Sequence, residues 1–128
     1  MMHNVIIGLG SNIEPEKNIP KAKEFLADQY RILKESRFMT TTPIGKFKQP
    51  SFINGAVAIK TELTQVQLEK VLKKIEAQLG RKRSKDKFSS RTIDLDIVVW
   101  DSKIVDKDFY KRDYLRQSIL EIEPDLKY

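Results

Sequence analysis

Two aspartates lie two residues apart in an otherwise apolar stretch, IDLDIVVW, at residues 93–100. Side chains alternate between the two faces of a strand, so a strand here would place Asp94 and Asp96 on one face, about 7 Å apart. Asp disfavours strands, so two on one face need open water or a cation. Val98 and Trp100 would share the face of the aspartates, and Ile93, Leu95, Ile97 and Val99 would form the opposite, core-facing side.

These two carboxylates have the chemistry of a magnesium site. Mg²⁺ is usually held by one or two protein carboxylates, with water and substrate phosphate oxygens completing its coordination. Asp94 and Asp96 can hold one ion between them or two bridged ions, and two ions can clamp the attacking and leaving oxygens at phosphorus. The alternative is a pair of solvent-exposed acids, and the apolar Val98 and Trp100 on the same face argue against full exposure.

A strongly basic run, RKRSKDKFSSR at residues 81–91, comes directly before the two acids and contains six Lys or Arg residues and one Asp. Arginine presents a planar fork that suits phosphate oxygens. Arg81, Arg83 and Arg91 are therefore candidates to bind a triphosphate and offset its charge. The run can also be a solvated loop or a nonspecific site for a nucleic-acid backbone.

A third cluster lies in the segment TTTPIGKFKQPSFINGA at residues 40–56. Asn54 carries an amide that can pair with the donor and acceptor edge of a heterocycle, and Phe52, on the same face of the expected strand, can pack on its ring. The alternative is that Phe52 belongs to the core.

Composition excludes several other chemistries. The 128 residues include no Cys and a single His, His3, so thiolate metal sites, His-rich zinc sites and a Ser-His-Asp triad are not expected. The sequence has no P-loop motif, no apolar run long enough to span a bilayer and no secretory leader, so we expect a cytoplasmic protein. The length favours one domain over residues 1–128.

The pattern of apolar residues predicts the order β-α-β-β-α-β. The expected strands cover residues 4–10, 31–41, 51–61 and 93–100, and the expected helices cover 15–30 and 65–79, with a short helix near 117–123. Thr64 and Gln67 match a capping box, and Gly80 suits the end of the second helix. This order predicts an α+β, ferredoxin-like fold, with a four-stranded antiparallel sheet and both helices packed on one face.

Together the motifs resemble those of the 6-hydroxymethyl-7,8-dihydropterin pyrophosphokinases of the folate pathway. The resemblance runs in order through GSN, TTPIG, QPSFINGAV, IEAQLGRKR, SSRTIDLDIVV and RDYLRQSILEIEPDL, which together extend over most of the chain. It implies the ferredoxin-like fold and a Mg²⁺-dependent transfer of pyrophosphate from ATP to the hydroxymethyl group of the pterin, with release of AMP.

The resemblance also implies roles for individual residues. Asp94 and Asp96 match the ligands of two Mg²⁺ ions, and the catalytic set would be these acids with Arg81 and Arg91. The positions that match ATP contacts are Glu76, Arg81, Arg83, Arg91 and Arg112. Those that match the pterin pocket are Thr41, Ile44, Phe52, Asn54 and Tyr114, and Phe88 matches an aromatic of the basic loop. We expect a monomer that acts on small molecules and binds neither nucleic acid nor membrane.

Two segments depart from the resemblance. Ser89 and Ser90 stand where the resemblance implies Gly-Pro before Arg91. DSKIVDKDFYKR, at residues 101–112, is shorter than its counterpart in typical members and lacks their Pro-His stretch. Two alternatives stay open. The short segment motivates a relative that binds pterin or nucleotide without catalysis, and the basic run at residues 81–91 motivates a small basic RNA-binding domain.

Overall fold

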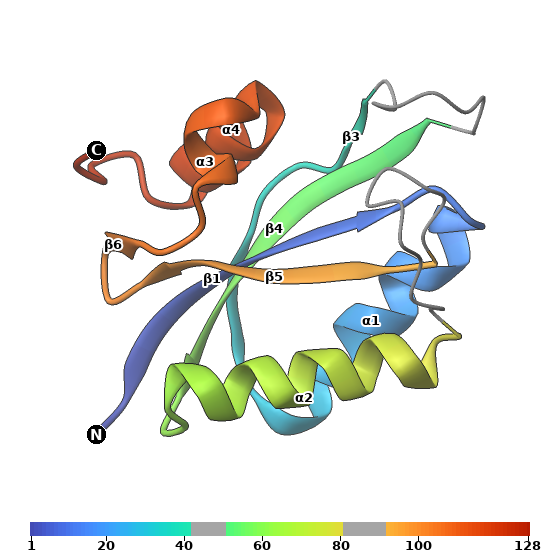
Figure 1. The fold of residues 1–128 in the computed structure, drawn as a ribbon, viewed down its shortest axis with the longest axis horizontal. Helices are drawn as coiled ribbons and strands as arrows, with labels where there is room; N and C mark the ends of the chain where they lie inside the picture. The colour runs from blue at the N-terminus through green and yellow to red at the C-terminus, as the bar shows by residue number, and fades with distance from the viewer. Residues whose placement is uncertain (42–50, 81–91) are drawn as a thin grey trace.

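The computed structural model describes residues 1–41, 51–80 and 92–128 (Figure 1). The predicted site residues Ile44, Arg81, Arg83 and Arg91, together with Phe88, lie outside the described residues. The elements in chain order are β1 (His3–Ser11), α1 (Pro15–Gln29), β2 (Ile32–Glu35), β3 (Met39–Thr41), β4 (Phe52–Thr61), α2 (Gln65–Gln78), β5 (Asp94–Trp100), β6 (Lys103–Ile104), α3 (Asp108–Lys111) and α4 (Asp113–Ile122).

The strands form one antiparallel sheet in the order β2-β4-β1-β5-β6, with β3 also paired to β4. The prediction of four strands is wrong, because the described residues form a sheet of six strands. The expected strand at 31–41 is two strands, separated at Ser36, whose Oγ accepts a hydrogen bond from the Ala56 N–H at 2.8 Å and so takes the place of a backbone partner. The short β6 extends the sheet beyond β5.

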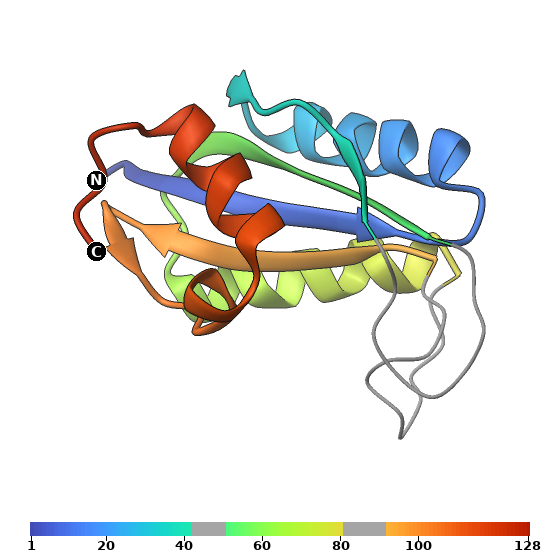
Figure 2. The same cartoon turned by 90° about the horizontal axis from the view of Figure 1, so that it is seen from above.

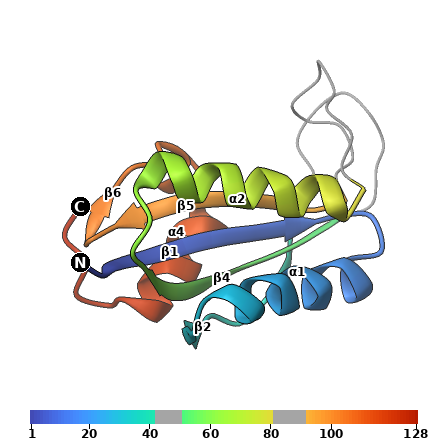
Figure 3. The ribbon, with the colours of Figure 1, turned by 90° about the horizontal axis from the view of Figure 1, so that it is seen from below.

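The two faces of the sheet carry different helices. α1 and α2 lie side by side on one face, as predicted (Figure 3), over a core of buried aliphatic residues that includes Leu26, Leu72 and Ile7. α4 crosses the opposite face (Figure 2) and buries a smaller cluster that includes Phe109, Ile119 and Ile6. The prediction that both helices pack on one face is therefore confirmed for α1 and α2, and α4, for which the sequence predicts no face, covers the opposite one.

Helix α2 begins where the sequence predicts. Thr64 Oγ1 accepts a hydrogen bond from the Gln67 N–H at 3.2 Å, and Gln67 Oε1 accepts one from the Thr64 N–H at 2.9 Å, which completes the capping box. Gly80 follows the helix with a positive φ of 88°. Among the described residues, no helix is long and apolar enough to cross a membrane.

A β-bulge in β5 changes the predicted faces of that strand. Ile7 pairs with Ile97 but Ile6 pairs with Val99, so β5 has one extra residue, Val98. Val98 and Val99 both pack in the cluster under α4, whereas Trp100 packs on the α1/α2 side. The predicted placement of Val99 with Ile97, and of Trp100 with the aspartates, is therefore wrong beyond the bulge.

Candidate active site

Asp94 and Asn54 lie in one row across the sheet, with a glycine between them. Gly10 of β1 pairs with Asp94 of β5 on one side and with Asn54 of β4 on the other, and Asn54 pairs in turn with Met39 of β3. Neighbouring strands are about 4.8 Å apart, so the backbones of Asp94 and Asn54 are roughly 10 Å apart. One face of the sheet therefore brings together the predicted acid and the predicted amide.

The next row has the same character. Gly8 pairs with Asp96 on one side and with Ala56 on the other, so β1 places glycine beside each aspartate. A Cβ at Gly8 would lie 3.2 Å from Leu115 Cδ1 of α4. The two glycines thus leave β1 itself without side chains on this face, so that Leu115 packs over Gly8 and the Asn54 amide lies over Gly10.

The predicted pterin residues of β3 and β4 are in contact. Asn54 Nδ2 donates a hydrogen bond to Thr41 Oγ1 at 2.5 Å, and a Cβ at Gly10 would lie 2.5 Å from Asn54 Oδ1 and 3.9 Å from Phe52 Cδ1. The absence of a side chain at Gly10 is therefore what lets the Asn54 amide occupy its place over β1. Thr41, Phe52 and Asn54 are all half-buried, so they combine fixed positions with solvent access.

The start of α4 adds Tyr114 to the acid side, and Arg112 lies just before the helix. Burial raises the pKa of Tyr114, Arg112 opposes that rise, and Asp108, Asp94 and Asp96 add to it. The phenol therefore stays protonated and neutral beside the two acids. The structure places this predicted pterin residue within electrostatic reach of the predicted metal ligands.

Two carboxylates near Asp94 were not identified from the sequence. These are Asp106 and Asp108. Burial is the main reason that the pKa of Asp106 is raised, and the nearby charges of Asp108 and Asp94 add to the rise. The hydrogen bond that Asp106 Oδ1 accepts from the Asp108 N–H at 2.9 Å opposes it. The sequence VDKDF at residues 105–109 repeats the Asp-x-Asp spacing of Asp94 and Asp96, and this repeat could have indicated further acids of the site. Proximity to Asp94 depends on how the chain folds back after β6, which spacing alone does not reveal.

Glu76 reaches the same strand from the opposite side. It is 7 % exposed, and its Oε2 accepts a hydrogen bond from the Leu95 N–H, which lies between the two aspartates, at 2.8 Å. On the β1 side, Ser11 Oγ donates to the carbonyl oxygen of Thr92 at 2.5 Å, just before β5 begins. Side chains from neighbouring elements therefore hold the backbone at the centre of the Asp-Leu-Asp segment, at Leu95, and just before the segment, at Thr92.

The shortened segment before α4 folds against the sheet. Phe109 of α3 is fully buried, and the Arg116 guanidinium donates to the carbonyl oxygens of Phe109 and Tyr110, each at 3.2 Å, and pairs with Asp113. These contacts join the C-terminal end of α3 to α4. A short packed helix thus lies within residues 101–112, the segment in which the sequence departs from the resemblance.

The chemistry of the donors fits a magnesium site of the kind that uses few protein ligands. Asp94 is half-buried, Asp96 is exposed, and both lie on the polar face of β5. In the described ranges, no group of three or more His, Cys, Asp or Glu residues is arranged to hold a metal. Two carboxylates are nevertheless the usual protein share of a Mg²⁺ site, because phosphate oxygens and water supply the rest.

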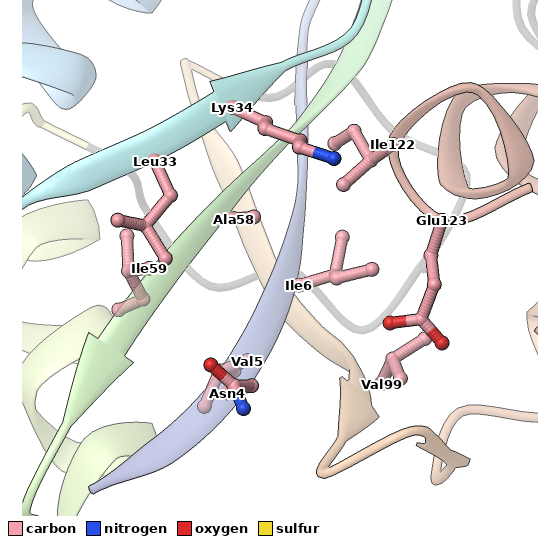
Figure 4. A pocket seen from close by; sticks show the side chains of 10 residues that line it. All are labelled: Asn4, Val5, Ile6, Leu33, Lys34, Ala58, Ile59, Val99, Ile122 and Glu123. Atoms are coloured by element: carbon pink, nitrogen blue, oxygen red, sulfur yellow. The ribbon is translucent and has the colours of Figure 1, made fainter.

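A separate groove lies at the other end of the sheet (Figure 4). It is lined by Leu33 and Lys34 of β2, by Ile122 and Glu123 at the end of α4, and by sheet residues between them. None of the predicted site residues lines it. The candidate active site is therefore the polar end of the sheet, where β1 carries Gly8 and Gly10.

Comparison with known proteins agrees with this arrangement. Residues 6–124 match the family described as 7,8-dihydro-6-hydroxymethylpterin-pyrophosphokinase (HPPK). The chain is 30% identical to a 2-amino-4-hydroxy-6-hydroxymethyldihydropteridine pyrophosphokinase of Pseudomonas aeruginosa, over 99% of this chain and 85% of that protein. It is 35% identical to the protein of the same name in Methylorubrum extorquens, over 98% of this chain and 85% of that protein.

A match with a plant protein extends the range of relatives. The chain is 36% identical to a folate synthesis bifunctional protein of Arabidopsis thaliana, over 75% of this chain and 20% of that protein. The near-complete coverage by the family and by the bacterial proteins places the chain in a class of pterin-directed phosphoryl-transfer proteins. It belongs to the 7,8-dihydro-6-hydroxymethylpterin-pyrophosphokinase family.

Proposed function

We propose that this protein transfers pyrophosphate from ATP to the hydroxymethyl group of 6-hydroxymethyl-7,8-dihydropterin, a step of folate biosynthesis, as a cytoplasmic monomer. Family membership supports the reaction. The observation that carries the assignment of the site is the row Asp94–Gly10–Asn54, which supports a pterin held near β4 with its hydroxymethyl group directed toward β5. The central strand order β2-β4-β1-β5, with α1 and α2 on one face, supports the ferredoxin-like description of the fold.

The proposed pterin subsite consists of Thr41, Ile44, Phe52, Asn54 and Tyr114. The Asn54 amide pairs with the heterocycle edge while Thr41 fixes its orientation, and Phe52 packs on the ring. A neutral Tyr114 adds no negative charge where the phosphates arrive.

The proposed ATP subsite lies on the side of β5. Its proposed contacts are Arg81, Arg83, Arg91 and Arg112, of which Arg81 and Arg91 offset the charge that develops during transfer. Asp94 and Asp96 are the proposed carboxylate ligands of two Mg²⁺ ions. When bound, Mg²⁺ supplies Lewis-acid stabilisation of the phosphate oxygens.

The reaction then depends mainly on positioning. The pterin hydroxyl oxygen attacks the β-phosphorus of ATP, the bond from that phosphorus to the oxygen bridging to the α-phosphorus breaks, and AMP leaves with that oxygen. The hydroxyl proton passes to water. No protein base is assigned, because phosphoryl transfer is driven largely by alignment and electrostatic stabilisation.

The test is AMP formation by the purified chain with ATP, Mg²⁺ and the hydroxymethylpterin. We expect AMP only when all three are present, and we expect Asp96→Ala to lower kcat by about 10³-fold or more without lowering thermal stability. Asp28→Ala, at an exposed acid of α1, is the matched control and keeps full turnover. Saturable ligand binding without AMP formation would identify a non-catalytic relative, and magnesium-independent RNA binding would favour the basic-domain alternative.

A further inference from the structure

The Asp-Leu-Asp segment lies where β5 lacks a described strand partner on one side. β6 pairs only with Val99 and Trp100, so along residues 94–97 the side of β5 away from β1 has no described strand. A buried backbone N–H without an acceptor is costly. The Leu95 N–H meets this need through the Glu76 carboxylate at 2.8 Å.

The position of this hydrogen bond connects it to the orientation of the two aspartates. The Leu95 nitrogen belongs to the peptide unit that joins Asp94 to Leu95, and the Leu95 side chain is buried against α1 and α2. Fixing this peptide unit limits rotation of the strand about its axis. That rotation determines where the side chains of Asp94 and Asp96 point, because both leave the strand on the face opposite Leu95.

We propose that Glu76 is a positioning residue, which holds the Asp94–Leu95 peptide from the α2 side so that both carboxylates are preoriented for divalent cations. This inference rests on the proposed function, and it assigns Glu76 a role that acts through β5 rather than through direct contact with ATP. Residues that orient metal ligands in this way typically change metal affinity or activity by about 10–100-fold when they are mutated.

Three substitutions of Glu76 separate the two roles. Gln keeps an acceptor oxygen and removes the charge, Met keeps the length and removes the acceptor, and Asp keeps the charge but is one methylene too short to reach Leu95. The matched control is Thr64→Ala, which removes a capping hydrogen bond from the opposite end of α2 and leaves β5 untouched.

The first measurement is amide hydrogen exchange at Leu95 in the metal-free protein. We expect the Leu95 amide to exchange slowly in the wild type and in Glu76→Gln, and faster in Glu76→Met and Glu76→Asp. Thr64→Ala should leave it unchanged relative to neighbouring amides of β5. Equal exchange at Leu95 in all five proteins would overturn the proposal, whether or not the chain forms AMP.

The second measurement is Mn²⁺ binding with a nonhydrolysable ATP analogue, together with kcat and both KM values. Glu76→Met and Glu76→Asp should weaken Mn²⁺ binding and lower kcat about 10–100-fold. Glu76→Gln, which keeps an acceptor oxygen, should lose less than either, and Thr64→Ala should stay near the wild type. If Glu76→Met does not fold, Glu76→Asp carries the same comparison. A rise in the KM for ATP alone, equal in Gln and Met variants, would instead show direct nucleotide contact. Absence of AMP formation by the wild type would remove the proposed function and leave the exchange and Mn²⁺ results to decide the role of Glu76.

Discussion

The two faces of the sheet differ in how far their helices extend. α1 and α2 cover one face along its length, so Val5, Ile7 and Leu9 of β1 are all buried in one core (Figure 3). On the other face α4 crosses the sheet short of the tip of β1 (Figure 2). The face under α1 and α2 is therefore packed along its whole length. The face under α4 is packed at one end and carries the candidate site at the other.

The side chains of β1 differ in size between the two faces of the sheet. On the face toward α4 its side chains run from Ile6 to Gly8 to Gly10, so apolar bulk decreases toward the end that holds Asp94 and Asn54. On the opposite face the side chains stay large. β1 therefore contributes large apolar side chains to the core on one face, and on the other face its side chains become smaller toward the candidate site.

The largest expected effect on stability comes from the packed face. Leu72 of α2 is 2 % exposed, and Leu72→Ala should lower the free energy of unfolding by about 2–5 kcal/mol, because a cavity remains where the side chain was. Val66→Ala, on the same helix but 61 % exposed, should change it by less than about 0.5 kcal/mol. Urea unfolding measures both, and similar losses would contradict the division into faces.

Two glycines test the comparison directly. Gly10 and Gly55 lie in adjacent rows of the β1–β4 pair, and an added Cβ would come within 2.5 Å of a side chain at each, namely Asn54 Oδ1 and Phe38 Cδ2. Phe38 packs on the α1/α2 core, so Gly55→Ala should cost about 1–3 kcal/mol of stability and leave both KM values unchanged.

Gly10→Ala should affect the KM for the pterin more than it affects stability. It displaces the Asn54 amide, so the KM for the pterin should rise about 10- to 100-fold while the KM for ATP changes little. Steady-state kinetics gives the KM values of both variants, and urea unfolding gives their stabilities. If Gly10→Ala lowered stability as much as Gly55→Ala and left the pterin KM unchanged, the role of Gly10 would be structural only.

Local patterns predicted the elements of this fold better than their pairing. The capping box of Thr64 and Gln67 and the aspartates on one face of β5 both depend on spacing within one segment, and both are found as predicted. The bulge at Val98 was missed because alternation is strict only in an uninterrupted ladder, and an extra residue becomes visible only through its partner strand.

The site shows the same limit. Residue types pointed to Asp94, Asp96 and Asn54, but the row that joins them through Gly10 depends on the register of three strands. Glu76 was assigned to ATP by its place in a motif, whereas its contact with Leu95 depends on how α2 lies against β5. The roles of these residues with ligands stay predictions, and those of Ile44, Arg81, Arg83 and Arg91 concern residues outside the described ranges.

The smallest expected effect lies at the opposite end of the sheet from the site. Asp101, in the turn between β5 and β6, accepts hydrogen bonds from His3 Nδ1 at 2.7 Å and from the Asn4 N–H at 2.8 Å. These bonds, that to His3 first, lower the pKa of Asp101. The folded state then binds this proton less readily than the unfolded state, so the contribution of Asp101 is present above pH ~4 and is lost as the pH falls through the lowered pKa.

The side chain of Asp101 is 43% exposed, so solvent should limit this contribution to less than about 1 kcal/mol. Urea unfolding of the wild type and of Asp101→Asn between pH 2 and 7 isolates it, because the other carboxylates titrate in both proteins. The wild type should be more stable at pH 7, and the difference should shrink as the pH falls below about 4. A pH-independent difference would show that the pairing does not stabilise the charged carboxylate, and reduced AMP formation by Asp101→Asn at pH 7 would contradict the separation of this end from the site.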